Sequence, residues 1–417
     1  MAPRSVRSMV GTSKKDMLKG GFYETVRIPL YIYRLIGILP ISGLWHRSSK
    51  YNRFSLKSFY TIIYAPTIVM QTFLLLVHIY DLFAFFFGHQ RLGRLIYHMN
   101  FYTITILIFM GSRKWKNVIK EIETIELTLP RLRNSKKALA LTKSFVFAFF
   151  VFSLAEVVLI LQFTLRLTKQ RHVLPGDSGL YLRSYFVYIF PYLYDHFPFS
   201  YVMGFIVQII KVQGIITLNM VNCSVVILSI YLTNRLKHYN RIVFAKGSKT
   251  NNTRLKWVEL NLLYTRISNL VKIIDKNLNP FVFISFTANL SYICAQLFYI
   301  LNKLTSSRTV KITSFLEDKR SDWETVLYIS ISFALVVLKV LLVSITAAEV
   351  HTTSREPLRL LYTLPTAEYT IETQRLMTQV YYSNLSLSGL NFFHITRGML
   401  LGMVATLLTY EIVLLQI

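Results

Sequence analysis

The sequence predicts an all-α polytopic membrane protein with about seven transmembrane helices, a cytosolic N-terminus and an extracellular C-terminus. Of its 417 residues, 53% are hydrophobic and only 16% are charged, and the mean hydropathy is +0.43. Several apolar stretches are about 20 residues long, which is the length that a helix needs to cross a ~30 Å hydrocarbon core. This composition argues against a large soluble domain.

Charge in the loops sets the orientation. The N-terminal segment and the loops at 111–143, 233–280 and 348–390 hold about 33 Lys and Arg, whereas the alternate loops hold about 10. Because positive loops stay in the cytosol, the N-terminus is predicted to be inside and, after an odd number of spans, the C-terminus outside. The net charge of +27 is explained by this placement, and no motif or solvated basic face indicates a nucleic-acid partner.

The N-terminal segment, residues 1–57, is predicted to be a basic cytosolic region that carries an interfacial helix. Ile28–Trp45 is apolar but is interrupted by Pro29, Arg34 and Pro40. Such interruptions suit a helix that lies at the membrane surface better than one that crosses it.

Residues 58–346 are predicted to form the first six transmembrane helices. In the second of them Arg94 and His98 are expected to snorkel outward. The fourth follows an aromatic entry segment, Tyr185–Phe199, and in the fifth Asn279 is expected to cap a helix that begins with Pro280. The expected spans are Phe59–Tyr80, Leu92–Met110, Ser144–Leu165, about Ser200–Leu232, Phe281–Leu301 and Trp323–Thr346.

Two charged residues lie inside these apolar stretches. Glu156 is in the middle of the third span and Lys339 is in the sixth. An intramembrane carboxylate is costly enough to indicate a functional site, but a buried Lys or hydroxyl partner explains it equally well. Lys339 is a conceivable partner for it. The aromatic entry segment has two interpretations as well, an interfacial aromatic belt or one wall of a ligand pocket.

The segment 347–388 is polar but patterned, and it is predicted to be a cytosolic anchor or assembly region. Helical spacing over Thr370–Tyr382 places four side chains on one face, and such a face requires a protein partner. The partner is either this subunit or a neighbouring one. The four are Leu376, Met377, Val380 and Tyr381.

The last span, within residues 389–417, carries a stripe of small and polar side chains. The stripe comprises Gly402, Ala405, Thr406, Thr409, Val413 and Gln416. Small residues let membrane helices approach closely, so the stripe fits a helix interface, and it also fits a pore lining. Glu411 points about 140° away from Gln416 at roughly 100° per residue, so it is expected to face neighbouring helices.

The end of the chain, from Thr409-Tyr410 through Gln416-Ile417, resembles the C-terminal motif of insect gustatory receptors, with Glu411 and Ile417 departing from it. Gly389, Phe392-Phe393 and Arg397 are similar to the start of that family's last helix. Tyr33–Pro40 is similar to its entry segment. The resemblance covers the two ends of the chain, and the middle agrees with it in topology.

This resemblance implies a tastant-gated, non-selective cation channel of four identical or related subunits in the plasma membrane of gustatory sensory neurons. It implies that Thr409, Val413 and Gln416 line the pore, that Tyr410, Ile412 and Leu415 serve as gate or packing residues, and that 347–388 anchors the subunits. A tastant would occupy the outer half of each helix bundle. The candidate contacts are Glu156, Tyr188, Tyr192, Tyr292, Gln296 and Tyr328.

The Tyr-rich, acid-poor outer segments favour bitter or other non-sugar ligands, because sugars need many paired polar groups. The alternatives are a G-protein-coupled chemoreceptor, which predicts an external N-terminus, and an odorant-receptor-type channel subunit. A transporter predicts internal repeats, which the sequence does not show. No catalytic set, cofactor motif or metal-ligand spacing appears, so the sequence predicts no enzyme, no cofactor and no metal.

Overall fold

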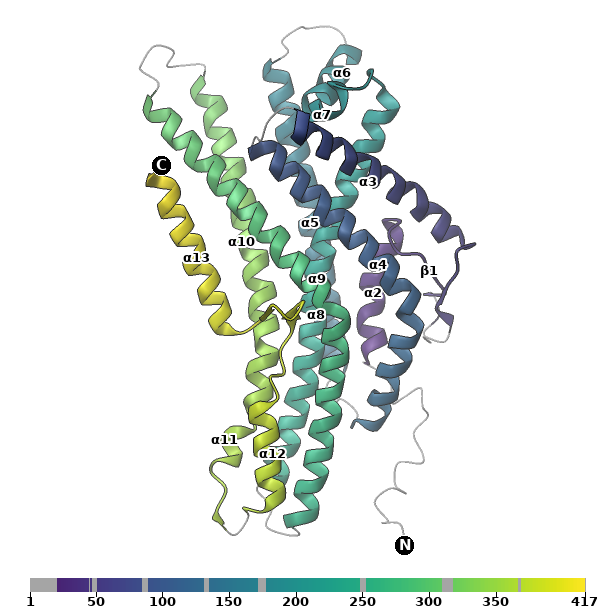
Figure 1. The fold of residues 1–417 in the computed structure, drawn as a ribbon, viewed down its shortest axis with the longest axis vertical. Helices are drawn as coiled ribbons and strands as arrows, with labels where there is room; N and C mark the ends of the chain where they lie inside the picture. Colours follow the sequence, from purple (N-terminus) through teal and green to yellow (C-terminus); the bar gives the residue numbers. More distant parts are fainter. Residues whose placement is uncertain are drawn as a thin grey trace.

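The computed structural model describes residues 21–44, 46, 51–84, 89–130, 135–171, 178–247, 253–309, 318–366 and 369–416. They form an elongated bundle of helices, with Ile371–Tyr382 toward one end and the end of the last helix toward the other (Figure 1). The helices are α2 Phe22–Leu35, α3 Phe59–Ala84, α4 His89–Thr128, α5 Ser135–Arg171, α6 Ser178–Ile189, α7 Pro191–Tyr194, α8 Tyr201–Gly247, α9 Thr253–Thr309, α10 Asp318–Arg355, α11 Leu358–Leu361, α12 Ile371–Tyr382 and α13 Arg397–Gln416.

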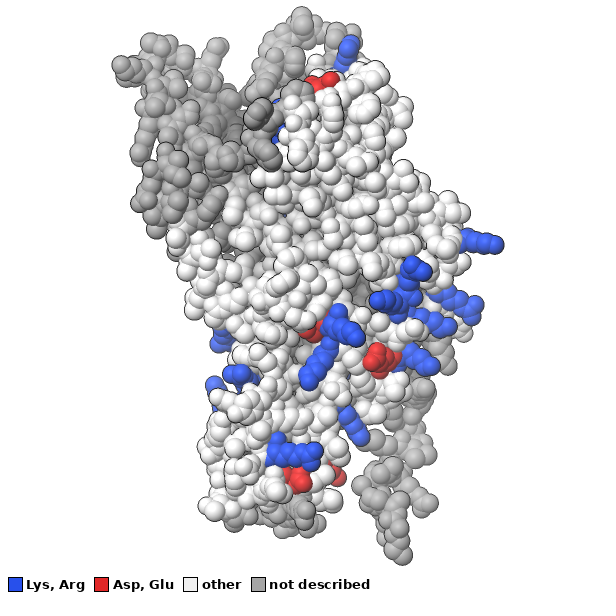
Figure 2. All heavy atoms as spheres, in the orientation of Figure 1, with Lys and Arg blue, Asp and Glu red and all other residues white. Residues whose placement is uncertain are grey.

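Six of the described helices are long and apolar enough to cross a membrane: α3, α4, α5, α8, α9 and α10. The 20-residue α13, about 30 Å long, is the last of the seven predicted spans. Figure 2 shows one face of the molecule with a broad band of uncharged described residues in the upper half and with Lys and Arg gathered below it. This distribution agrees with a membrane-embedded upper part and a basic cytosolic part.

Several helices are longer than the sequence predicts. The expected loop at 111–143 is wrong over most of its length, because α4 continues to Thr128 and α5 already begins at Ser135. The basic residues lie on a helix that leaves the membrane, so they interrupt hydropathy without ending the helix. Likewise α5 continues beyond the expected end of the third span at Leu165, as far as Arg171.

The expected helix start at Asn279 is also wrong, because Pro280 lies inside the continuous helix α9. Proline is tolerated within transmembrane helices where neighbouring groups satisfy the freed backbone. Here the chain segment before α13 packs beside the proline, and the Leu390 N–H donates to the Asn279 carbonyl at 3.4 Å.

The long helix α8 forms the centre of the bundle. At 47 residues it is about 70 Å long, more than twice the hydrocarbon core, so it extends well below the membrane. Side chains around its whole circumference are buried, among them Val225, Val226, Ile227 and Leu232. A helix that is apolar on all sides belongs in the middle of its neighbours, which here are α2, α5, α9 and α10.

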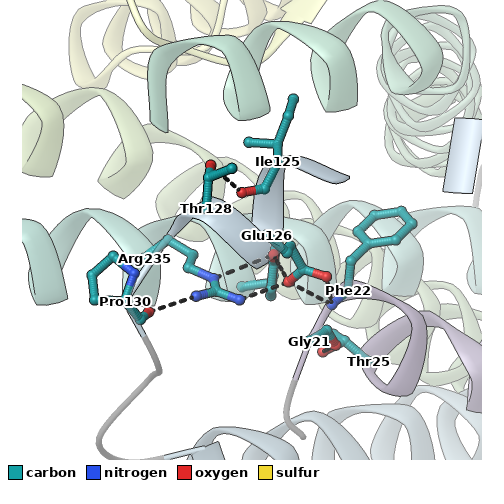
Figure 3. Close-up of polar contacts among 9 residues, drawn as sticks. Gly21, Phe22, Thr25, Ile125, Glu126, Thr128, Pro130 and Arg235 are labelled. Atoms are coloured by element: carbon teal, nitrogen blue, oxygen red, sulfur yellow. Dashed lines mark hydrogen bonds and ion pairs between the residues drawn. The ribbon is translucent and has the colours of Figure 1, made fainter. Parts of the chain in front are cut away.

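The interfacial helix α2 is fixed to the lower bundle through a buried ion pair (Figure 3). Arg235 Nη2 on α8 lies 2.6 Å from Glu126 Oε1 on α4, and both side chains are almost fully buried. The same carboxylate accepts hydrogen bonds from the Phe22 N–H at 3.1 Å and from the Tyr231 hydroxyl at 2.5 Å. Arg235 Nη1 donates to the Pro130 carbonyl at 3.3 Å. Glu126 therefore satisfies a donor at the start of α2 while it holds α4 against α8.

The lower ends of α8, α9 and α10 pack with α11 and α12 into the predicted anchor region (Figure 1). Thr370 caps α12 by accepting a hydrogen bond from the Thr373 N–H. The expectation that four α12 side chains share one partner-seeking face needs correction. Leu376 and Val380 are fully buried against this subunit's own helices, whereas Tyr381 is half exposed and Met377 lies between. Of these four, Tyr381 is the most accessible to another chain, because α9 covers the i, i+4 face of α12.

A short hairpin joins the anchor to α13. Its strands, β3 Ser388–Gly389 and β4 Phe393–His394, pair antiparallel, as do β1 Ile41–Ser42 and β2 Arg53–Phe54 near α2. The Asp275 carboxylate on α9 accepts from the Ser388 N–H at 2.7 Å and from the Ser388 hydroxyl at 2.8 Å. A side chain at Gly389 would lie 2.3 Å from the Phe393 ring, so this position needs glycine.

Candidate functional site

A cavity of about 440 Å³ lies in the upper bundle, away from α11 and α12. It is enclosed by α4, α5, α8, α9 and α10 and is closed on one side by the end of α6 and by α7. Polar side chains from every one of these long helices reach it. A concave site of this size with convergent polar groups is the usual form of a small-molecule site.

One stripe of α8 forms the back of the cavity. Lys211, Ile215, Leu218, Asn219 and Asn222 all line it, and their spacing of three, four and seven residues places them on one helix face. Lys211 is about 15 Å from the outer end of α8. The cavity thus occupies the outer half of the bundle.

Glu156 and Lys339 form an ion pair in the lining of the cavity. Lys339 Nζ lies 3.0 Å from Glu156 Oε2 and 2.9 Å from Asn219 Oδ1. Asn219 Nδ2 also donates to Glu156 Oε2 at 2.9 Å. The predicted pairing of these two intramembrane charges is therefore present, and Asn219 closes the arrangement into a three-membered network that joins α5, α8 and α10.

A second network lies between α8 and α9. The Asn222 Oδ1 atom accepts from the Ser285 hydroxyl and from Asn289 Nδ2, the latter at 3.0 Å. One to two turns further along α9, the Tyr292 hydroxyl shares a hydrogen bond of 3.1 Å with Ser332 of α10. Amide and hydroxyl groups can both donate and accept, so this wall can exchange internal hydrogen bonds for bonds to a hydroxylated ligand.

The outer end of the cavity is aromatic and cationic. Arg94 lines it, and Arg94 Nη2 lies 3.3 Å from Asp81 Oδ2 on α3. The expected outward snorkelling of Arg94 and His98 is wrong, since Arg94 has this buried partner and His98 is buried against the His78 ring at 4.3 Å. The Tyr192 ring packs against the His78 ring in a tilted arrangement, with the ring centroids 4.1 Å apart. Burial raises the pKa of the Tyr192 phenol, so it remains a hydrogen-bond donor at neutral pH.

The cavity brings together four of the six predicted ligand contacts, Glu156, Tyr192, Tyr292 and Tyr328. The Tyr328 ring stacks on Phe163 at 4.1 Å. The other two lie outside the lining: Tyr188 is replaced there by the adjacent Ile189 and Phe190, and Gln296 donates to Ser332 at 3.0 Å behind the wall.

Sequence reasoning missed several lining residues, namely Lys211, Asn219, Asn222, Ser285 and Asn289. The signal was available in part. Lys211, Asn219 and Asn222 are polar residues at helical spacing inside an apolar run, and a strictly structural core stripe would be apolar there.

The predicted pore residues lie on α13, which stands beside α9 and α10 (Figure 1). Gly402, Ala405, Thr406 and Thr409 are all exposed on the single chain. The side chains of Val413 and Gln416, and those of Tyr410, Ile412 and Leu415, lie outside the described part of α13, as does that of Glu411. The described half of the stripe is thus free to face other subunits or a pore.

The arrangement is suited to binding and contains no catalytic chemistry that the described residues reveal. In this part of the chain no group of three or more His, Cys, Asp or Glu residues could hold a metal ion. The internal networks leave amide, hydroxyl, carboxylate and ammonium groups on one small cavity with aromatic walls. This combination can recognise a polar ligand that offers many hydrogen-bonding groups.

Comparisons with known proteins agree with this fold and this kind of site. The family model described as trehalose receptor matches residues 7–417. Drosophila melanogaster "Gustatory receptor for sugar taste 61a" is 26% identical and covers 95% of this chain and 88% of its own. "Gustatory receptor 5a for trehalose" of the same organism is 24% identical, over 97% and 87%.

The structure is also similar to that of a solved chemoreceptor. The insect olfactory receptor OR5 from Machilis hrabei aligns with a TM-score of 0.64 at 15% identity, over 94% of this chain and 97% of that one. Its complex with eugenol aligns with a TM-score of 0.61 at 14% identity, over 97% and 100%. The predicted class of fold, a helical insect chemoreceptor, is confirmed.

Proposed function

Since the chain belongs to the trehalose receptor family of insect gustatory receptors and is a multi-pass membrane protein, we propose that it is a sugar-gated, non-selective cation channel of gustatory neurons. Four subunits would each contribute α13 to a central pore. The observation that carries the sugar assignment is the lining of the cavity, where amide and hydroxyl groups of Asn219, Asn222, Ser285, Asn289 and Tyr292 converge.

This proposal differs from the ligand class that the sequence alone favours, which is bitter or other non-sugar compounds. That prediction rests on the tyrosines in the outer segments and on the lack of acidic residues there. The polar lining comes instead from the middles of α8 and α9. The names of the two relatives, which refer to sugar taste and to trehalose, favour the same ligand class.

Ligand binding can reach the pore helix through α9. The same helix carries the cavity residues Ser285 and Asn289 and, about 15 Å lower, Asp275. Asp275 holds the Ser388 hairpin that leads into α13. A sugar that binds the open arrangement of α8, α9 and α10 more tightly would therefore shift α13 toward that state.

The sugar assignment is tested with Asn222→Ala. This change removes the acceptor of Ser285 and Asn289 and one polar group of the wall. We expect the half-activating sugar concentration to rise roughly 10- to 100-fold, measured as whole-cell current in cells with G-protein signalling blocked. Asn117→Ala, at an exposed position on α4, is the matched control. A sugar current that Asn222→Ala leaves unchanged would argue against this cavity, and one abolished by the block would argue against a channel.

The coupling route is tested with Asp275→Ala. Because Asp275 holds the hairpin and does not line the cavity, we expect sugar affinity on purified protein to stay within about 3-fold. The maximal sugar-evoked current should fall severalfold at equal surface expression. Asp275→Asn, which keeps one acceptor oxygen, should fall less. Equal loss of affinity and current would place Asp275 in binding and contradict the route through α9.

A further inference from the structure

Lys211 carries a charge within the cavity that no described residue balances. Its side chain lines the outer half of the cavity from the back wall on α8. The ammonium makes no hydrogen bond or ion pair with any described residue. The Lys211 Nζ atom lies over the face of the Phe190 ring, 6.0 Å from the ring centroid. The Tyr97 hydroxyl donates to the Lys211 carbonyl at 3.2 Å, which holds the backbone and leaves the ammonium free.

The acidic groups in and near the cavity already have cationic partners. Glu156 accepts from both Lys339 and Asn219. Asp81 lies near two arginines, at 3.3 Å from Arg94 and 3.8 Å from Arg91. The described groups at the cationic end, Lys211 with Arg94 and Arg91 against Asp81, therefore hold more positive than negative charge.

An unpaired ammonium in a membrane-embedded cavity is costly unless a partner completes it. Lysine offers three donors and no acceptor, so the missing partner is an acceptor, and an anionic one gives the strongest bond. The nearby walls, Phe190 and Ile215, are apolar and supply none. The partner must therefore come with the ligand.

We propose that this cavity takes an acidic saccharide, a uronic or aldonic acid, with its carboxylate on Lys211 and its hydroxyls on the Asn222, Ser285 and Asn289 wall. The inference rests on the proposed function, in which this cavity is the sugar site, and it narrows the ligand class. A single carboxylate fits better than a doubly charged phosphate, because Glu156 lines the same cavity and would repel a second negative charge.

The test is direct binding to the purified full-length protein in lipid nanodiscs, measured by titration calorimetry. D-glucuronate and D-glucose form a matched pair that differs only in the acid group. Wild type is expected to bind glucuronate at least about 10-fold more tightly than glucose. Lys211→Met, of similar length but neutral, should weaken glucuronate binding about 10- to 100-fold and leave glucose within about 3-fold. Lys143→Met, at an exposed position on α5, is the control.

Each other outcome is decisive. Glucose binding as tight as or tighter than glucuronate, unchanged by Lys211→Met, would overturn the acidic-ligand inference and leave the sugar site in place. If glucose binding required chloride in wild type but not in Lys211→Met, the partner of the Lys211 ammonium would be a free anion. This result would also overturn the acidic-ligand inference. Monodisperse wild-type protein that binds neither saccharide would overturn the proposed sugar function itself.

Discussion

Glu126→Ala is expected to destabilise the receptor by about 3–5 kcal/mol, the usual cost of removing one partner from a buried ion pair. The Arg235 guanidinium would remain almost fully buried without a carboxylate, and the Phe22 N–H and Tyr231 hydroxyl would lose their acceptor. The donors of Arg235 and Phe22 converge on this one side chain (Figure 3). The apparent melting temperature of detergent-solubilised protein, followed by size-exclusion chromatography, measures the effect.

The control for this prediction separates charge from size. Glu121→Ala, at an exposed position one and a half turns earlier on α4, should change the melting temperature little. The double variant Glu126→Leu with Arg235→Leu removes both charges and should recover much of the loss, since apolar pairs often replace buried ion pairs without cost. If Glu126→Ala behaved like Glu121→Ala, the carboxylate would not be the element that holds α2 to the bundle.

The pairing of Glu156 with Lys339 could be anticipated from the sequence because each is a lone charge inside an apolar run. Such charges must find partners, and few candidates exist within the membrane. The partner on α8, Asn219, could not be identified in the same way. A single amide in a long apolar helix has many acceptable positions, and only the packing of α5 and α10 against α8 selects this one.

Lys211 illustrates a different limit. It lies in an apolar run much like Glu156, yet the run around it is longer than one span, so its depth in the membrane depends on where α8 begins. The sequence places that start at about Ser200, and the structure has it at Tyr201, after the short helix α7. Once the start is known, the stripe through Lys211, Asn219 and Asn222 follows from helical spacing alone.

Helix lengths were the least predictable part of the fold. Hydropathy reports where a helix leaves the hydrocarbon, and it does not report where the helix ends. The α4 helix therefore continues past Gly111 into a basic segment, and α9 passes through Pro280 without a break. The cavity is even harder to predict from the sequence than the helix lengths, because it depends on how the long helices cross.

The exposed small and polar stripe of α13 keeps the two interpretations that its sequence allows. Thr406 and Thr409 return their hydroxyls to the backbone of their own helix, at 2.9 Å each. These bonds satisfy both hydroxyls without a neighbouring helix. The face can therefore pack against another copy of the chain or line a water-filled pore. The tetrameric pore thus remains a proposal, and a measurement of how many subunits assemble would test it.

Lys339→Met is the prediction that joins stability to ligand binding. The variant leaves Glu156 as a carboxylate inside the membrane with only the amide of Asn219 as a donor. We expect a loss of about 3–5 kcal/mol in stability, measured as a drop in melting temperature of the solubilised protein. Lys276→Met, at an exposed position on α9, should have little effect.

The second variant decides which role the pair has. Combining Lys339→Met with Glu156→Gln removes both charges, while the amide introduced on α5 can still exchange hydrogen bonds with Asn219, so stability should largely return. If the pair serves only the fold, sugar binding should return with it. If the charged pair contacts the ligand as the cavity lining indicates, binding should stay at least about 10-fold weaker in a protein of restored stability. If Lys339→Met alone were as stable as wild type, this result would contradict the ion pair itself, because a buried carboxylate cannot lose its cation without a cost in stability.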